Sequence, residues 1–536
     1  MHTATIYIYD QSTSPGGIVS FKAILEMLES RLHLAPVLRR RIVRVPMDMD
    51  HPYWIEDPDF DLEFHVRHIA LPKPGDWRQL CIQAARLHSR PLDLNRPLWE
   101  INVIEGLDNV EGIPSGSFAF VLKMHHAAVD GVSGIELITA LHDLVPGVLP
   151  PGPTSKWVPD TVPQPWELLA RASVNQALRP FQFAEAMSRM MPAVSGVTPR
   201  AARAMTAQAQ PPRTRFNVTL SAHRVVDGLK VPLSGVKQIR ASLERATVND
   251  AMLAVVSGGL RRYLQSKAEL PTESLLTMVP VSVRDPKTKS DGGNQVASMV
   301  VPLHTNIENP QERFAAIRDS TLGAKAALEA IGARNLTEFA QFLPGGLIGA
   351  ATRLNAELRT ANQVTPAFNV VVTNVPGPQV PMYTMGAKLI ATYGMGPIYD
   401  GMGLMNIITS YCGEVYLAFT ASREVMSDPA FYTQCLRESY DELLAPTASA
   451  PASTVKAPVQ RSVKKQTRHK APADSAAATL AAKKSVAPKK SVAPKKSATP
   501  KKAATPKKSV VLAKAAARSK PIAKKAAPRT AAARSR

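Results

Sequence analysis

Apolar and polar residues in the first 145 positions alternate between strand and helix spacings. An apolar run over residues 4–9 predicts a short strand, and apolar positions on one helical face predict a helix over residues 20–33. Strict alternation over residues 60–66 predicts a half-buried strand. Residues 99–103 and 117–124 flank a turn rich in Gly, Pro and Ser, which predicts an antiparallel pair. This order of elements is typical of an α+β domain.

The pattern changes after residue 145. Residues 146–165 contain seven prolines, which favours a connecting segment, and helical spacing follows over residues 166–191. A second block of strand and helix patterns covers residues 216–445. The sequence therefore predicts two α+β domains, at 1–145 and 216–445, joined by a long crossover over 146–215.

The basic charge of the chain belongs to its final segment, residues 446–536. That segment holds 24 of the 65 Lys and Arg residues and one of the 43 Asp and Glu residues, and it has no aromatic residue. Residues 1–445 carry 41 basic and 42 acidic groups, and this balance argues against a body that coats itself with nucleic acid. Prolines precede Lys-Lys pairs at a six-residue period, and the low apolar content predicts disorder.

Other totals narrow the cellular setting. Cys81, Cys412 and Cys435 are too few and too widely spaced for a disulfide framework, which favours a reducing compartment. No apolar run reaches the roughly 18 residues that cross a bilayer, and no export signal is visible at the start. We therefore expect a cytoplasmic protein.

The segment directly after the strand at 117–124 contains side chains that can take part in catalysis. It is His125-His126-Ala127-Ala128-Val129-Asp130-Gly131. Neighbouring residues on an extended segment point to opposite sides, so one histidine should be structural and the other should enter a site. An imidazole is well matched to accepting a proton near neutral pH. The alternative is that both histidines are ordinary polar residues at a strand end. The spacing does not favour a metal site.

Asp130 has two possible roles. It either orients the imidazole or holds the loop by pairing with an arginine from elsewhere, and we favour the second; Arg284 is the candidate partner. No G-x-S-x-G turn is present and no cysteine adjoins a histidine in sequence, which disfavours a covalent acyl-enzyme. A histidine base would then activate an acceptor hydroxyl directly, with a reactive acyl ester, most simply a thioester, as donor.

These residues resemble the active-site motif of the CoA-dependent acyltransferase superfamily, and the chain resembles a bacterial wax ester synthase/acyl-CoA:diacylglycerol acyltransferase over nearly all of residues 1–445. The order and spacing of several short segments carry the resemblance. They are Leu38-Arg39-Arg40-Arg41, Phe60-Asp61-Leu62, Leu71-Pro72-x-Pro74-Gly75-Asp76, Pro91-Leu92-Asp93, Pro97-Leu98-Trp99, Asn249-Asp250 and Asn374-Val375-Pro376-Gly377-Pro378.

The resemblance implies two chloramphenicol-acetyltransferase-like domains with a substrate channel between them. It implies that His126 is the general base, that His125 is auxiliary, that Asp130 is a structural partner and that Gly131 keeps the loop clear. It also implies transfer of a long-chain acyl group from acyl-CoA, as co-substrate, to diacylglycerol or a fatty alcohol, without a cofactor or metal.

The other matched residues have weaker interpretations. Thr247-x-x-Asp250 has helix-start spacing, so Asn249 either aims at a developing oxyanion or belongs to a simple cap. Trp99 is expected in the core near the channel. The turn at the end of the strand over residues 370–373 either lines the channel or is a plain loop; its residues are Asn374, Pro376 and Gly377.

Family members carry a Leu-Ser-x-x-Asp segment before the first strand, whereas Met1-His2 here resembles the Met-His pair that begins that strand. Either the start is misplaced or this form lacks the segment, and we expect reduced activity in both cases.

The basic segment, with a net charge of +23, suits any polyanion. For a lipid-making enzyme we expect peripheral association with an anionic membrane or lipid-inclusion surface, with nucleic acid or no partner as alternatives. Two other functions stay open: a related transferase that uses a carrier-protein-bound acyl donor, and a polyanion- or lipid-granule-binding protein with an inactive body.

Overall fold

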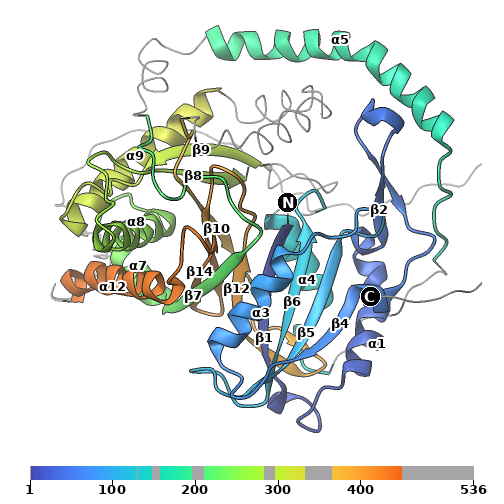
Figure 1. The fold of residues 1–536 in the computed structure, drawn as a ribbon, viewed down its shortest axis with the longest axis horizontal. Helices are drawn as coiled ribbons and strands as arrows, with labels where there is room; N and C mark the ends of the chain where they lie inside the picture. Colours follow the sequence, from blue (N-terminus) through green and yellow to red (C-terminus); the bar gives the residue numbers. More distant parts are fainter. Residues whose placement is uncertain are drawn as a thin grey trace, which may run out of the picture. The chain divides into compact units, whose positions relative to one another are not determined.

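The computed structural model describes residues 2–128, 131–147, 152, 157–195, 210–282, 296–331, 362 and 365–448. Residues 1–455 form one compact unit, within which the described residues build two six-stranded sheets (Figure 1). The predictions for residues 449–536 lie outside the described residues. The α+β class predicted from the sequence is confirmed.

The first sheet has the strand order β11-β12-β1-β6-β5-β4, antiparallel except for the parallel pair β4–β5. Its strands are β1 (His2–Asp10), β4 (Val66–Ala70), β5 (Trp99–Leu107), β6 (Ser117–His125), β11 (Tyr383–Thr384) and β12 (Ala387–Met395). The helices that pack with it are α1 (Phe21–Arg31), α2 (Leu62–His65), α3 (Trp77–Ser89) and α4 (Gly131–Leu141). The predicted antiparallel pair is β5–β6.

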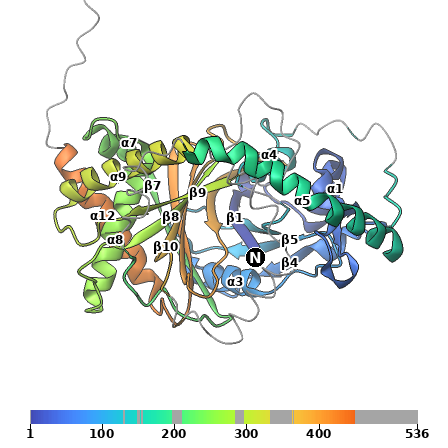
Figure 2. The same cartoon turned by 90° about the horizontal axis from the view of Figure 1, so that it is seen from above.

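The second sheet has the order β7-β14-β13-β10-β8-β9, with β10 parallel to both of its neighbours. Its strands are β7 (Arg224–Pro232), β8 (Leu276–Ser282), β9 (Val296–Pro302), β10 (Val370–Pro376), β13 (Leu404–Tyr411) and β14 (Glu414–Ser422). Helices gather on one side of this sheet (Figure 2): α7 (Leu233–Ala241), α8 (Val248–Ser266), α9 (Pro310–Ile331) and α12 (Pro429–Ala448).

Outside the two sheets, β2 (Arg40–Val43) pairs with β3 (Tyr53–Glu56), and the long helix α5 (Pro165–Ser195) covers the helix predicted at 166–191. A small cluster, with Leu168 and Ala172 of α5 against Val45, holds α5 to this hairpin region.

The predicted division of the chain did not anticipate one exchange between the halves. β11 and β12 come from the C-terminal half, yet they extend the first sheet, where β12 pairs with β1. The two sheets approach closely at β12 and β13. A Cβ on Gly394 of β12 would lie 2.5 Å from Cγ2 of Ile407, so only glycine fits there. The sheets are also joined by a hydrogen bond, 3.0 Å long, from the Tyr416 hydroxyl to the Ile390 carbonyl.

The strand predicted over residues 60–66 is wrong. Leu62–His65 is one helical turn, α2, and β4 begins only at Val66. The alternation placed His65 on a polar face, but its side chain is 1% exposed. His65 stacks on Trp99 with ring centroids 4.6 Å apart and donates from Nδ1 to the Trp99 carbonyl at 2.8 Å. This tertiary contact overrides the local pattern.

Candidate active site

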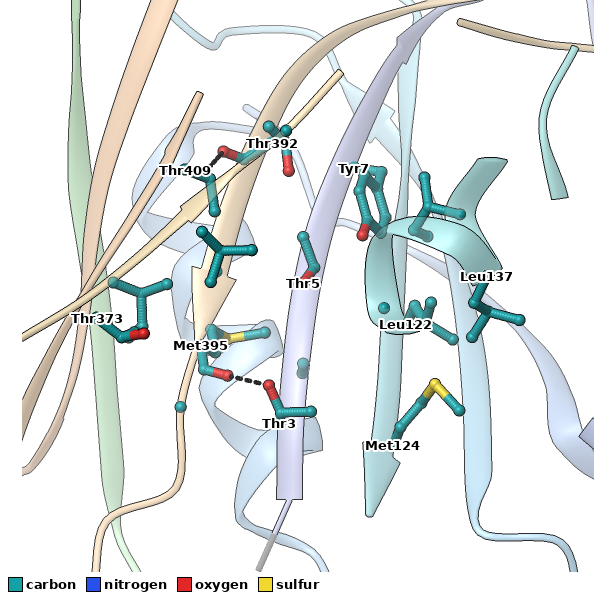
Figure 3. Close-up of a pocket in the computed structure, with 18 of the residues that line it drawn as sticks. Thr3, Thr5, Tyr7, Leu122, Met124, Leu137, Thr373, Thr392, Met395 and Thr409 are labelled. Atoms are coloured by element: carbon teal, nitrogen blue, oxygen red, sulfur yellow. Dashed lines mark hydrogen bonds between the residues drawn. The ribbon is translucent and has the colours of Figure 1, made fainter. Parts of the chain in front are cut away.

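A cavity of about 530 Å³ lies between the two sheets. Residues of β1, β6, β12 and α4 line it from the side of the first sheet, and residues of β8, β9, β10 and β13 from the second. Most of the lining is apolar, including Ile407 and, as Figure 3 shows, Leu122, Met124, Leu137 and Met395. A cavity of this size and lining suits an alkyl chain.

The end of β6 delivers His126 to this cavity. Leu122 and Met124 line the cavity, whereas Lys123 is directed away from it and donates to the Leu87 carbonyl at 2.9 Å. His125 ends the strand and His126 begins the following turn. His126 lines the cavity and His125 does not. The two histidines therefore face different surroundings.

His125 is held by local contacts. Its Nδ1 accepts the Ala127 N–H at 3.2 Å, and its backbone N–H donates to the Leu98 carbonyl at 2.9 Å. Its ring packs edge-on against His2, which is its register partner on β1, with centroids 5.6 Å apart. Burial, more than the positive charges nearby, lowers the pKa of His125 to about 4. His125 is thus a neutral hydrogen-bond acceptor that shapes the turn before His126.

The remaining residues of the motif are only partly described. Asp130 and its suggested partner Arg284 lie outside the described residues, so their pairing stays a prediction. Gly131 is the first residue of α4. Gly134, Leu137 and Ile138 on this helix line the cavity, so α4 forms the wall that follows His126 in sequence.

Hydroxyl side chains line a second part of the cavity. Thr3 and Thr5 of β1 project into it from alternate positions (Figure 3). The Thr3 hydroxyl donates to the Met395 carbonyl at 3.3 Å, and the Thr409 hydroxyl donates to the Thr392 carbonyl at 3.2 Å. These bonds occupy the hydroxyl protons with backbone oxygens, and they leave methyl groups and oxygen lone pairs for the cavity.

The end of β10 and the turn after it contribute to the lining. Thr373, Val375, Gly377 and Pro378 line the cavity, whereas Asn374 and Pro376 do not. A Cβ on Gly377 would lie 2.3 Å from the Ser410 carbonyl oxygen, so glycine permits the close approach of β10 and β13 here.

Asn249 and Asp250 do not line the cavity. Asp250 is fully buried in a capping box that begins α8: its Oδ2 accepts the Thr247 N–H at 2.8 Å and the Thr247 hydroxyl at 2.7 Å. Its Oδ1 accepts the Thr321 hydroxyl at 2.8 Å, which ties α8 to α9. These contacts agree with the capping interpretation of the motif.

Trp99 also lies away from the cavity. It is 1% exposed, and its Nε1 donates to the Leu38 carbonyl at 2.7 Å. Its contact with His65 makes it part of the core of the first sheet.

Sequence reasoning did not identify the lining residues of β1, which are Thr3, Ala4, Thr5 and Tyr7. The alternation of threonine and apolar residues in this strand was the available signal. The lining residues of β12 had no such signal, because nothing local indicates that this strand joins the first sheet.

Two structural surveys apply to the described residues alone. Within those ranges, no three His, Cys, Asp or Glu side chains gather to hold a metal ion. None of the helices in the described part of the chain is long and apolar enough to cross a membrane.

Comparisons with known proteins agree with this geometry. The model of the wax ester synthase/diacylglycerol acyltransferase catalytic domain matches residues 1–252, and the model of the corresponding C-terminal domain matches residues 292–444. A protein of Mycobacterium tuberculosis (strain CDC 1551 / Oshkosh) named "Putative diacyglycerol O-acyltransferase MT1809" is 32% identical over 437 residues, which cover 81% of this chain and 84% of that protein.

Solved structures give the same fold. The wax ester synthase/diacylglycerol acyltransferase from Marinobacter aquaeolei VT8 matches with a TM-score of 0.56 and 25% identity, covering 84% of this chain and 95% of that one. The first condensation domain of the calcium-dependent antibiotic synthetase matches in fold, with a TM-score of 0.50 and 15% identity over 84% of this chain and 92% of that one. The resemblance found in the sequence is confirmed: the chain belongs to the wax ester synthase/diacylglycerol acyltransferase family and is an acyltransferase.

Proposed function

We propose that this acyltransferase moves a long-chain acyl group from acyl-CoA to the hydroxyl of diacylglycerol or a fatty alcohol, with His126 as the general base. The observation that carries the proposal is the position of His126, at the edge of a largely apolar cavity between the two sheets. An apolar cavity accommodates alkyl chains, and an imidazole beside it can accept the proton of an incoming hydroxyl. The names of the family and of its Mycobacterium relatives support the acceptor class.

The transfer needs no covalent enzyme intermediate. An imidazole nitrogen of His126 takes the proton of the acceptor hydroxyl while that oxygen attacks the thioester carbonyl. The new C–O bond forms, the C–S bond breaks as the tetrahedral adduct collapses, and the CoA thiolate takes the proton back from the imidazolium. CoA is a substrate in this scheme, and we propose that no other cofactor takes part.

His125 acts through the turn. With a pKa lowered to about 4 it stays neutral at pH 7, and its acceptance of the Ala127 N–H fixes the backbone that presents His126. His125 is therefore a positioning residue in the proposal.

The test is a transfer assay with radiolabelled palmitoyl-CoA, offered dioleoylglycerol and hexadecanol in competition, with products separated by chromatography. His126→Ala should lower kcat by about 10²- to 10⁴-fold, the usual contribution of a general base. The matched control is His125→Ala, which we expect to lower kcat by less than about tenfold. Circular dichroism melts of both variants check that the fold is retained.

Two results would contradict the proposal. A folded His126→Ala variant with turnover within tenfold of the parent protein would remove His126 as the base. A parent protein that ignores palmitoyl-CoA but accepts palmitoyl-carrier protein would replace the donor.

We further propose that the protein meets its lipid acceptor at an anionic membrane or inclusion surface. The net charge of +23 on residues 446–536 supports this, because each Lys near anionic headgroups contributes about 1 kcal/mol. Cosedimentation of the full chain with phosphatidylserine vesicles should be lost in 0.5 M salt and after removal of residues 456–536, since residues 1–455 are a compact unit. Equal binding with and without that segment would refute the role of the charge.

A further inference from the structure

Three side chains that line the cavity also line a second, much smaller void. Tyr7 of β1, Leu122 of β6 and Ile138 of α4 line both the 530 Å³ cavity and a void of about 10 Å³. They are contributed by two paired strands and by the helix that covers them (Figure 3 shows Tyr7 and Leu122). These side chains therefore form a partition between the two spaces.

Most of the side chains that line the smaller void are apolar. The rest of its lining includes Met27 and Leu28 of α1, Ile101 of β5, Phe120 of β6 and Leu141 of α4. A side chain removed from the partition would thus connect the cavity to more apolar surface, and no charged group would have to lose water.

Two polar side chains, Tyr9 and His142, also line the void. The Tyr9 hydroxyl lies 2.7 Å from Nε2 of His142, and Nδ1 of His142 lies 2.7 Å from the Ile138 carbonyl. A carbonyl only accepts, so Nδ1 donates and Nε2 accepts from Tyr9. Beyond this pair, Arg31 forms a buried salt bridge with Asp143. The Tyr9 hydroxyl and the His142 imidazole thus bond each other, and Arg31 and Asp143 neutralise each other's charge away from solvent.

The partition lies in line with His126 along β6. Leu122 precedes His126 by four residues, which is about 13 Å of strand at 3.3 Å per residue, and both line the same cavity. A chain with its reactive carbonyl at His126 can therefore run along the strand face past Met124 toward the partition, and a palmitoyl chain, which is longer than this when extended, bends within the cavity.

We propose that Tyr7, Leu122 and Ile138 form a stop that sets the longest acyl chain the enzyme accepts. The inference rests on the proposed function and adds to it an upper limit on the length of the acyl chain. The part of the cavity next to these three side chains, which we call the lobe, is bounded by two strands and one helix. A space of this kind suits a single unbranched chain. Diacylglycerol carries two chains on one glycerol, so we assign this lobe to the acyl group of the donor and expect the acceptor on another side of His126.

The free energy of burying a methylene group predicts how far the chain-length preference should shift. Each methylene that passes from water into an apolar site changes affinity about fourfold, and a methylene that meets the stop loses that gain. Enlarging the lobe by a truncated side chain should raise the specificity for chains two carbons longer by roughly tenfold, and filling it should shorten the optimum by a similar factor.

The experiment measures kcat/KM for saturated acyl-CoA donors from C8 to C20 with one fixed acceptor, dioleoylglycerol. Ile138→Ala should move the optimum to longer chains, and Ile138→Phe should move it to shorter ones. The matched control is Ile408→Ala, which makes the same truncation at a buried position of β13 that lines neither the cavity nor the void. It should leave the optimum where it is in the parent protein.

Unfolding curves identify variants that have lost the fold, and Leu122→Ala with Leu122→Phe carries the same expectation if the Ile138 pair fails to fold. A second series, with hexadecanol and other alcohols of varied length as acceptors and palmitoyl-CoA as donor, tests the assignment to the acyl group.

An unchanged optimum in folded stop variants overturns the proposal, as does an equal shift in Ile408→Ala. A shift confined to the alcohol series overturns the assignment to the donor. If the parent protein uses no acyl-CoA at all, the proposed function fails instead, so the two failures are distinct.

Discussion

The end of β6 and the start of α8 both carry motifs typical of the family, but they use their polar side chains differently. At the end of β6, His126 faces the cavity while His125 makes local contacts. At the start of α8, the carboxylate of Asp250 is fully buried and accepts hydrogen bonds from Thr247 and Thr321. The comparison teaches that a motif indicates chemistry only where its polar atoms reach a space that a substrate can enter.

The largest effect on the stability of the fold should come from removing the Asp250 carboxylate. Asp250→Ala removes a buried carboxylate that accepts hydrogen bonds from the Thr247 N–H, the Thr247 hydroxyl and the Thr321 hydroxyl, so we expect the free energy of unfolding to fall by about 3 kcal/mol. Urea unfolding measures the loss. The kcat per folded molecule should stay within a few fold, the reverse of the pattern expected for His126→Ala.

Thr321→Val is the control, because it removes one of these hydrogen bonds and keeps the shape of the side chain; we expect about 1 kcal/mol. A stable Asp250→Ala variant with lost turnover would contradict the contrast between the two motifs.

The second prediction concerns acid. Burial lowers the pKa values of His88 and His142, both packed with the first sheet, to about 4 from an ordinary 6.5. Between pH 6.5 and about 4 the unfolded chain binds protons at these positions and the folded chain does not. Stability is therefore complete above pH 6.5 and falls as the pH is lowered, by at most about 1.4 kcal/mol per pH unit for each histidine.

Urea unfolding between pH 7 and 4.5 measures this slope. His88→Gln removes one of the two titrating groups, so it should make the free energy of unfolding less steeply dependent on pH. Thr321→Val at the α8 contact should leave this slope unchanged. A pH-independent stability over this range would show that these histidines bind protons equally in the folded and unfolded states, which contradicts the prediction.

The smallest effect is expected at Asn249, in the first turn of α8. Loss of an oxyanion donor costs about 10²- to 10³-fold in kcat. Because Asn249 does not line the cavity, we expect Asn249→Ala to change kcat by less than about threefold. Single-turnover assays with palmitoyl-CoA measure it, and a loss of a hundredfold would restore the oxyanion interpretation.

Local periodicity predicted much of the fold because it reports on elements that bury one face. The helix at 20–33 and the strands at 4–9, 99–103 and 117–124 correspond to α1, β1, β5 and β6. The strand at 60–66 failed because the stacking of His65 on Trp99, residues far apart in sequence, decides that segment.

The candidate site was predictable in part for the same reason. Alternation along β6 separates the surroundings of His125 and His126, and it can be read from the sequence. The cavity walls cannot be read in this way, since they depend on β12 joining β1 and on the approach of Gly394 to Ile407.

The pairing of β1 with β12 has a consequence for synthesis of the chain on the ribosome. Tyr9 of β1 pairs with Leu389, so one edge of β1 has no partner strand until 380 further residues have been synthesised. At 5–20 residues per second this delay is roughly 20 to 80 s. An open edge of this kind invites pairing with another nascent chain. Chaperone capture of the N-terminal segment during translation should therefore govern the yield of native enzyme.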